Sequence, residues 1–155
     1  MEVSAHGRCN LAFKITLDRG RFLSIIVNIL QTSKKGDNMA KAAFVINGAE
    51  NKNIIPALVL GSASAASGDT VYLFFTPGSA ELLKPGKIES LKPKGYPEAI
   101  ELWNGIKNLG GKFYLCELVL DVKDMKKEDF RDDVELVGAT TFIAEIEGAQ
   151  TTFAF

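Results

Sequence analysis

Short apolar runs recur along most of the chain, each bounded by turn residues. Two of them, Val71–Phe75 and Lys112–Cys116, are apolar at nearly every position, as expected of central strands in a parallel sheet that is buried on both faces. Ala42–Asn47 is a similar run that ends in Asn-Gly, a turn signal. Shorter runs at Val134–Val137 and Thr151–Phe155 predict a short strand and a closing edge strand.

Segments with helical spacing of apolar residues lie between these runs. Residues 51–66 carry apolar side chains on one face, and Asn51 or Asn53 can cap the start of this helix. Residues 97–109 repeat the pattern and are followed by glycine, which predicts a second helix. Residues 140–147 predict a third helix, with three apolar side chains turned inward: Phe142, Ile143 and Ile146.

The segment after Phe75 has a different character. Thr76-Pro77-Gly78-Ser79-Ala80 predicts a tight strand-to-helix junction, followed by a short helical turn at 80–83. Residues 84–97 contain three prolines and two glycines, which predicts a loop that is long for a small domain. Long loops at the ligand edge of a sheet often act as lids.

Strands that alternate with helices predict a single-domain, three-layer α/β sandwich with a mainly parallel sheet, of the flavodoxin or Rossmann kind. The chain has 155 residues and is 46% hydrophobic, enough to bury a sizeable core. Its 18 basic and 19 acidic residues are spread along the sequence, so we expect no nucleic-acid or membrane partner.

The chain has two cysteines, Cys9 and Cys116, and one histidine, His6. This set gives neither a disulfide framework nor the spacing of a zinc site, and a Cys–His catalytic pair has no obvious base. We therefore expect no metal and no cofactor. A reducing, cytoplasmic setting is the default for such a chain.

Residues 1–38 differ from the rest, because they carry six basic and three acidic residues in an otherwise acidic chain. The apolar run Phe22–Leu30 is far shorter than the roughly 20 residues of a transmembrane helix. The segment is an added amphipathic element, a disordered tail, or a mis-assigned start. We favour the last, because Met39 directly precedes the first predicted strand. The domain then comprises residues 39–155.

Cys116 is the residue with the most distinctive chemistry. It ends its predicted strand just where a helical turn, 117–122, is expected to begin. The carboxyl ends of parallel strands form the ligand edge of such sheets, and a helix N-terminus stabilises a thiolate. Glu117 would act against the thiolate if its carboxylate pointed inward. The alternative is a buried structural cysteine, a common fate of a lone thiol.

Four further residues are candidates for ligand binding because they follow strands at the same edge: Asn47, Thr76, Gly78 and Ser79. Backbone N–H groups in such a loop can hold an anion, although these residue types more often simply form turns. The lysines of the 84–97 loop are expected to be solvated, and could also steer an anion or an acidic partner: Lys84, Lys87, Lys92 and Lys94.

Several motifs together resemble the DsrE/DsrF-like family, whose members are often labelled predicted peroxiredoxins. They are Phe74-Phe75-Thr76, Gly111–Cys116, Met125–Asp129 and Val134–Ala139. The resemblance covers Met39 to Phe155 and leaves residues 1–38 unmatched.

The resemblance implies a small α/β domain that assembles into homo-oligomers, commonly trimers or hexamers. Such proteins carry sulfane sulfur on a cysteine as a persulfide and pass it along a relay, often with a TusA-like carrier protein. Cys116 matches the family cysteine. Some similar members have a second cysteine shortly afterwards, but residues 117–127 contain none, which leaves a one-thiol mechanism.

We therefore predict a sulfur carrier or sulfurtransferase-type protein, in which Cys116 holds sulfane sulfur as a persulfide or thiosulfonate and yields it to a partner thiol. The main alternative is a non-catalytic oligomeric module that binds a small ligand or nucleotide over residues 76–79. Thr76-Pro77-Gly78 is nevertheless unlike the phosphate-binding G-x-G-x-x-G motif. Peroxide reduction ranks third, because Arg131 is the only arginine from Met39 onward.

Overall fold

The five apolar runs form a single parallel sheet in the computed structural model, which describes residues 39–155. The strands lie in the order β4-β3-β2-β1-β5, and every neighbouring pair is parallel. Their bounds are β1 Lys41–Ile46, β2 Thr70–Phe75, β3 Lys112–Cys116, β4 Glu135–Val137 and β5 Thr151–Ala154. The predicted strands are confirmed. The hypotheses on residues 1–38, with Cys9 and His6, lie outside the described residues.

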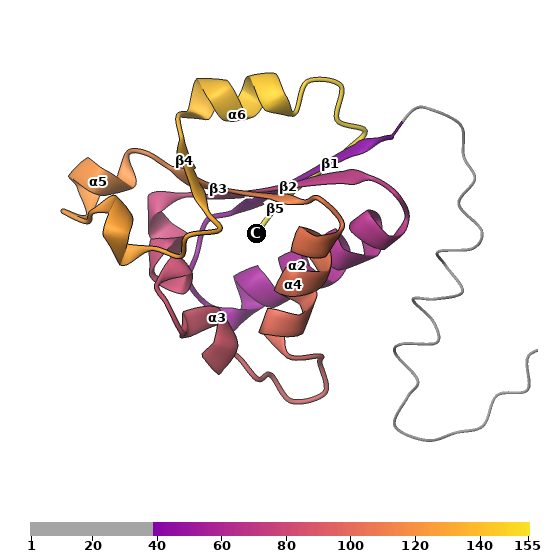
Figure 1. Cartoon of the computed structure of the whole chain (residues 1–155), viewed down its shortest axis with the longest axis horizontal. Helices are drawn as coiled ribbons and strands as arrows, with labels where there is room; N and C mark the ends of the chain where they lie inside the picture. Colours follow the sequence, from indigo (N-terminus) through magenta and orange to yellow (C-terminus); the bar gives the residue numbers. More distant parts are fainter. Residues whose placement is uncertain (1–38) are drawn as a thin grey trace, which may run out of the picture.

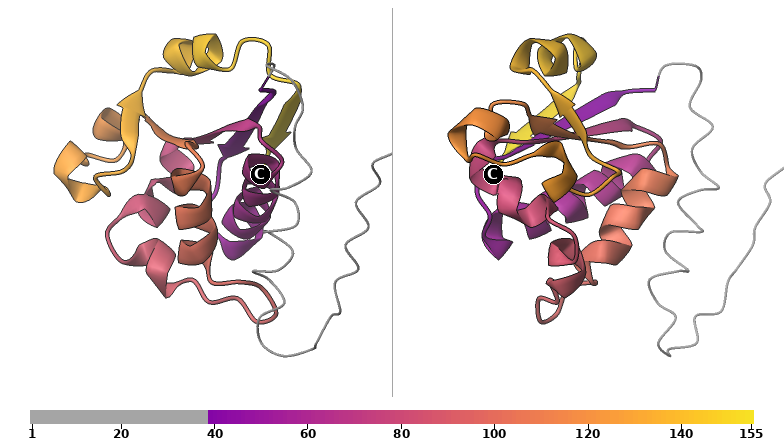
Figure 2. Two further views of the ribbon diagram at one scale, coloured as in Figure 1. Left: turned by 45° about the vertical axis from the view of Figure 1, so that its right-hand side comes forward. Right: turned by 60° about the vertical axis from the view of Figure 1, so that its left-hand side comes forward.

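Helices cover both faces of the sheet, so the predicted three-layer α/β sandwich is confirmed (Figures 1 and 2). On one face lie α2 (Asn51–Ala66), α3 (Lys87–Ser90) and α4 (Ala99–Asn108), with the 3-10 helix η1 (Pro77–Leu83) leading toward them. On the other face lies α6 (Ala139–Glu145). The β3–β4 connection contains α5 (Val119–Val122) and the short 3-10 helix η2 (Lys127–Asp129).

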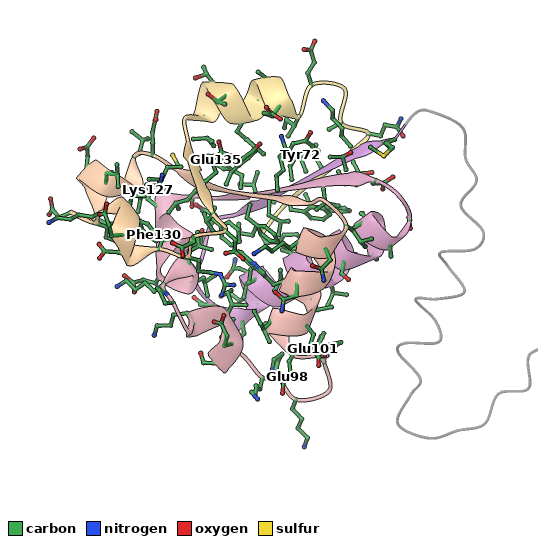
Figure 3. All side chains as sticks on the ribbon, in the orientation of Figure 1. Tyr72, Glu98, Glu101, Lys127, Phe130 and Glu135 are labelled. Atoms are coloured by element: carbon green, nitrogen blue, oxygen red, sulfur yellow. The ribbon has the colours of Figure 1, made fainter. Side chains whose placement is uncertain are left out.

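Alternation of side chains along the strands divides the core into two clusters. The larger cluster lies between the sheet and α2 and α4, where the ring of Trp103 stacks on Phe113 with centroids 3.8 Å apart. The smaller cluster lies on the α6 face and comprises Ala43, Tyr72, Phe74, Tyr114, Cys116, Val137 and Phe142. Figure 3 shows Tyr72 on this side of the sheet. The two clusters place Leu115 and Cys116 on opposite faces of β3.

Two predictions about helices were wrong in detail. Residue 50, a glutamate in extended conformation, is the N-cap of α2, and no side chain caps this end, so neither Asn51 nor Asn53 has the predicted role. Ile143 was predicted to face inward but is 63% exposed. The reason is that α6 has seven residues and buries one of them, Phe142, so its apolar stripe is narrower than the sequence pattern.

Residues 84–97 are less loop-like than predicted. They contain α3, whose Ile88 is fully buried in the larger core cluster. Glu89 of α3 forms an ion pair of 2.5 Å with Arg131, which links α3 to the segment before β4. The segment therefore packs into the layer of α4, on the face opposite Cys116, and is not placed to cover the thiol. No helix between Met39 and Phe155 is long and apolar enough to cross a membrane.

Candidate functional site at the carboxyl edge of the sheet

Cys116 is the last residue of β3 and lies opposite Val137 of β4 in the register of the sheet. Its thiol is free, and the residue is 5% exposed within the cluster that includes Val137 and Phe142. The predicted position at the carboxyl end of a central parallel strand is confirmed. The side chain is buried, as the alternative interpretation of the sequence expected, in a cluster that includes residues of β4 and α6.

The register of the sheet brings three predicted site residues into one row. Ile46 lies opposite Phe75, and Phe75 lies opposite Leu115. One position further along each strand are Asn47, Thr76 and Cys116. The amide of Thr76 still donates to the carbonyl of Ile46 at 3.0 Å, so the ladder continues to this position.

Because Phe75 and Leu115 belong to the larger cluster, alternation predicts that the next side chain along each strand turns toward the α6 face, and Cys116 lies in the cluster on that face. Neighbouring strand backbones are about 4.8 Å apart, so each residue is the direct neighbour of the next. The Thr76 hydroxyl donates a hydrogen bond of 2.8 Å to Oδ1 of Asn47. Because Oδ1 is the acceptor of this bond, the amide N–H groups of Asn47 are the donors that a ligand could use.

Gly78 and Ser79 do not join the row. Ser79 is fully buried, and its hydroxyl lies 2.7 Å from the carbonyl oxygen of Ile46 and 3.0 Å from that of Thr76. The hydroxyl therefore fixes the loop to the end of β1 and is not available to a ligand, in contrast to the prediction. A Cβ on Gly78 would lie 2.3 Å from the carbonyl oxygen of Asn47, so this position requires glycine for close approach of two backbones.

The helical turn predicted at residues 117–122 is present, and its regular part is short. It is α5, a single turn that begins at Val119 and has no side-chain cap. A one-turn helix has few aligned peptide dipoles, so its effect on a nearby thiolate is small. The amide of Glu117 donates to the carbonyl of Val137 at 3.1 Å, and its carboxylate lies against Gly138. The side chain of Glu117 thus extends over the start of α6.

A second polar cluster lies on the opposite face, and sequence reasoning missed it. Asp133 accepts hydrogen bonds from Trp103 Nε1 at 3.1 Å, Lys107 Nζ at 2.9 Å and Arg131 Nε at 3.0 Å. Burial raises the pKa of Asp133, but hydrogen bonds from Arg131, Lys107 and Trp103 outweigh it and hold this pKa far below its usual range. A hollow of about 420 Å³ borders Arg131, but Cys116 does not line it.

The charged groups of this second cluster are paired with one another, which indicates that the cluster stabilises the fold. The buried indole N–H of Trp103, which needs an acceptor, was the signal in the sequence. Within residues 39–155, no three His, Cys, Asp or Glu side chains gather to hold a metal ion.

Comparison with known proteins agrees with this fold. Residues 88–153 match the model of the DsrE/DsrF/DrsH-like family, which confirms the resemblance seen in the sequence. Residues 88–153 of this chain are DsrE/DsrF-like. The matched segment contains Cys116 but not Asn47 or Thr76, so the DsrE-like match bears on the thiol and not on the rest of the row.

The crystal structure of the ychN protein from E. coli is similar in fold, with a TM-score of 0.60 and 18% sequence identity. The similarity covers 76% of this chain and 100% of that chain. At this identity it supports the architecture alone. No curated protein matches the sequence.

Proposed function

We propose that this protein is a sulfur carrier that holds sulfane sulfur on Cys116 and passes it to a partner thiol. The observation that carries the proposal is the place of Cys116, at the carboxyl end of a central strand within the DsrE/DsrF-like segment. Ligands bind at this edge in open α/β sheets. DsrE-like proteins are generally linked to sulfur relays, which makes sulfur the natural cargo of this thiol.

The chemistry consists of two thiol exchange steps. The Cys116 thiolate attacks a sulfane sulfur; a bond forms between Sγ and that sulfur, and the bond from that sulfur to its leaving group breaks. The leaving group departs with the electron pair, as a thiolate or as thiosulfate. A partner thiolate then attacks the outer sulfur, and Cys116 leaves as a thiolate. The two steps are balanced and need no external oxidant or reductant.

Asn47 and Thr76 suit a donor that carries negative charge. The amide N–H groups of Asn47, oriented by the Thr76 hydroxyl, lie in the same row as Cys116. They can hold a sulfonate or polysulfide terminus next to the thiol. The acceptor in this proposal is the thiol of a TusA-like carrier protein, and the carrier itself acts as a homo-oligomer, a trimer or hexamer.

One observation favours a second candidate, a non-catalytic module with a structural thiol. Cys116 is 5% exposed in an apolar cluster, as inert buried cysteines are. Such a module would bind its ligand at Asn47 and Thr76 without using the thiol. The two candidates differ in whether Cys116 reacts with sulfur donors.

Intact mass before and after incubation with tetrathionate tests the proposal. The full chain should carry Cys9→Ser, so that Cys116 is its one thiol. We expect a gain of sulfur or thiosulfonate that dithiothreitol removes and that Cys116→Ser abolishes. A folded protein that gains no mass, even after long incubation, would favour the module.

A further inference from the structure

Among residues 39–155, one short helix, α6, covers the face of the sheet that carries Cys116 (Figure 1). Three aromatic side chains of the central strands on this face are each less than 10% exposed: Tyr72, Phe74 and Tyr114. We propose that α6 is a lid, which must lift from the sheet before a sulfur donor can reach Cys116.

The centre of the lid is held by one aromatic contact. Phe142 is the buried residue of α6, and its ring stacks on Phe74 with centroids 4.4 Å apart and an interplanar angle of 19°. The remaining residues of α6 are exposed or half-buried. A helix that buries so little apolar surface opens at a far lower free energy than the whole domain.

Two lysines hold the far end of the lid. Lys41 of β1 donates from Nζ to the carbonyl oxygens of Glu145 and Glu147, at 2.8 and 3.1 Å. Lys112 of β3 pairs with the carboxylate of Glu145 at 3.2 Å. Both ammonium groups also lie over the ring of Tyr72, at 6.0 and 5.6 Å from its centroid.

The ends of the lid are suited to hinge motion. Gly138 precedes α6, and Gly148 follows it with a φ of +76°. The contacts of Lys41 and Lys112 are partly exposed, so they restrain the far end without fixing it. Lifting of α6 about these glycines would remove Phe142 from the cluster around Cys116 and leave the sheet in place.

The lid gives the buried thiol a route to its reaction. This inference rests on the proposed function and adds to it, because the opening of α6 would set the rate at which a sulfur donor reaches Cys116. It can be tested without any sulfur chemistry, since the reaction of the thiol with an alkylating reagent depends only on access. A failure of this test and a failure of tetrathionate loading are therefore separate results.

The experiment measures the rate of N-ethylmaleimide labelling of Cys116 in the full chain with Cys9→Ser. Phe142→Ala should label about tenfold faster, because the closed state loses its one buried anchor. The matched control is Phe113→Ala, which removes a stacked, buried ring from the opposite face of the sheet. If α6 opens locally, Phe113→Ala leaves the rate within about twofold of the parent at temperatures well below unfolding.

Milder variants cover the case in which a truncated phenylalanine unfolds the domain. Lys41→Met should speed labelling about threefold, whereas Lys84→Met, which loses an exposed pair with Glu81 in η1, should leave the rate unchanged. Equal rates in Lys41→Met and Lys84→Met would overturn the proposal. Labelling of the parent as fast as a free thiol would also overturn it.

Discussion

Gly78 is the residue at which the site tolerates least change. A methyl group there would meet the Asn47 carbonyl oxygen at 2.3 Å, a distance that no side-chain rotation can relieve because the obstacle is backbone. The loop and the end of β1 would have to separate. The same movement would disturb the hydrogen bond between Thr76 and Asn47, so the packing of this glycine and the geometry of the row are linked.

We predict that Gly78→Ala lowers the free energy of unfolding by about 2 kcal/mol or more, as expected for overpacking against a rigid neighbour. Gly105→Ala is the matched control, because its added Cβ would lie 3.8 Å from Ser62 Oγ in ordinary contact within α4. That change should stabilise the protein by about 0.5–1 kcal/mol. Urea unfolding measures both, and equal values for the two variants would contradict the prediction.

At the scale of elements, periodicity predicted strands and long helices well, but failed where a neighbour decides the outcome. The strand β2 and the helix α2 follow from apolar patterns that are local to each segment. The burial of α3 depends instead on Ile88 meeting the side of α4 and on the pair between Glu89 and Arg131, which are 42 residues apart. No local pattern in the 84–97 segment carries that information.

The cluster around Asp133 joins α3, α4 and the lead into β4. Its carboxylate binds three donors, so Asp133→Asn should cost about 2 kcal/mol in the free energy of unfolding at pH 7. The lowered pKa means that ionised Asp133 stabilises the fold fully above the ordinary carboxyl pKa, and this contribution falls as the pH drops toward the folded-state pKa.

The difference in the free energy of unfolding between the parent and Asp133→Asn should therefore be constant from pH 8 to pH 5, because pH 5 is still about one unit above the ordinary aspartate pKa of ~3.9. Below pH 5 the difference should shrink. Thermal unfolding followed by circular dichroism across this range measures the difference. A difference that grew as the pH fell would show that the assigned hydrogen bonds are not the cause.

At the scale of the whole molecule, the candidate site is assembled from three strands that are distant in the sequence. Asn47, Thr76 and Cys116 could be predicted individually because each follows a strand, and parallel strands share one ligand edge. Their alignment in one row depends on the register of the strands. The position of α6 over Cys116 depends on the order of the strands in the sheet. Since β4 and β5 are the two edges of the sheet, a right-handed crossover between them places α6 on the face opposite α2 and α4.

This assembled row gives a prediction about the charge of the sulfur donor. Asn47→Asp replaces amide donors with a carboxylate two strands from Cys116, and should slow loading by tetrathionate about tenfold through charge repulsion. The rate with a neutral disulfide such as dithiodipyridine should change by less than about twofold, because that reagent carries no charge to repel. Mass spectrometry over time measures both rates, and equal slowing of the two would indicate a general effect on access.

The pairing of β5 with β1 has a consequence for the newly made protein. β1 is completed when the chain reaches Ile46, but its neighbour on one side, β5, begins at Thr151. Until β5 has paired with β1, α6 is attached to the sheet through β4 alone, and Cys116 lies at the end of β3 without its cover. We therefore expect oxidants to modify this cysteine more often while the chain folds than in the folded protein.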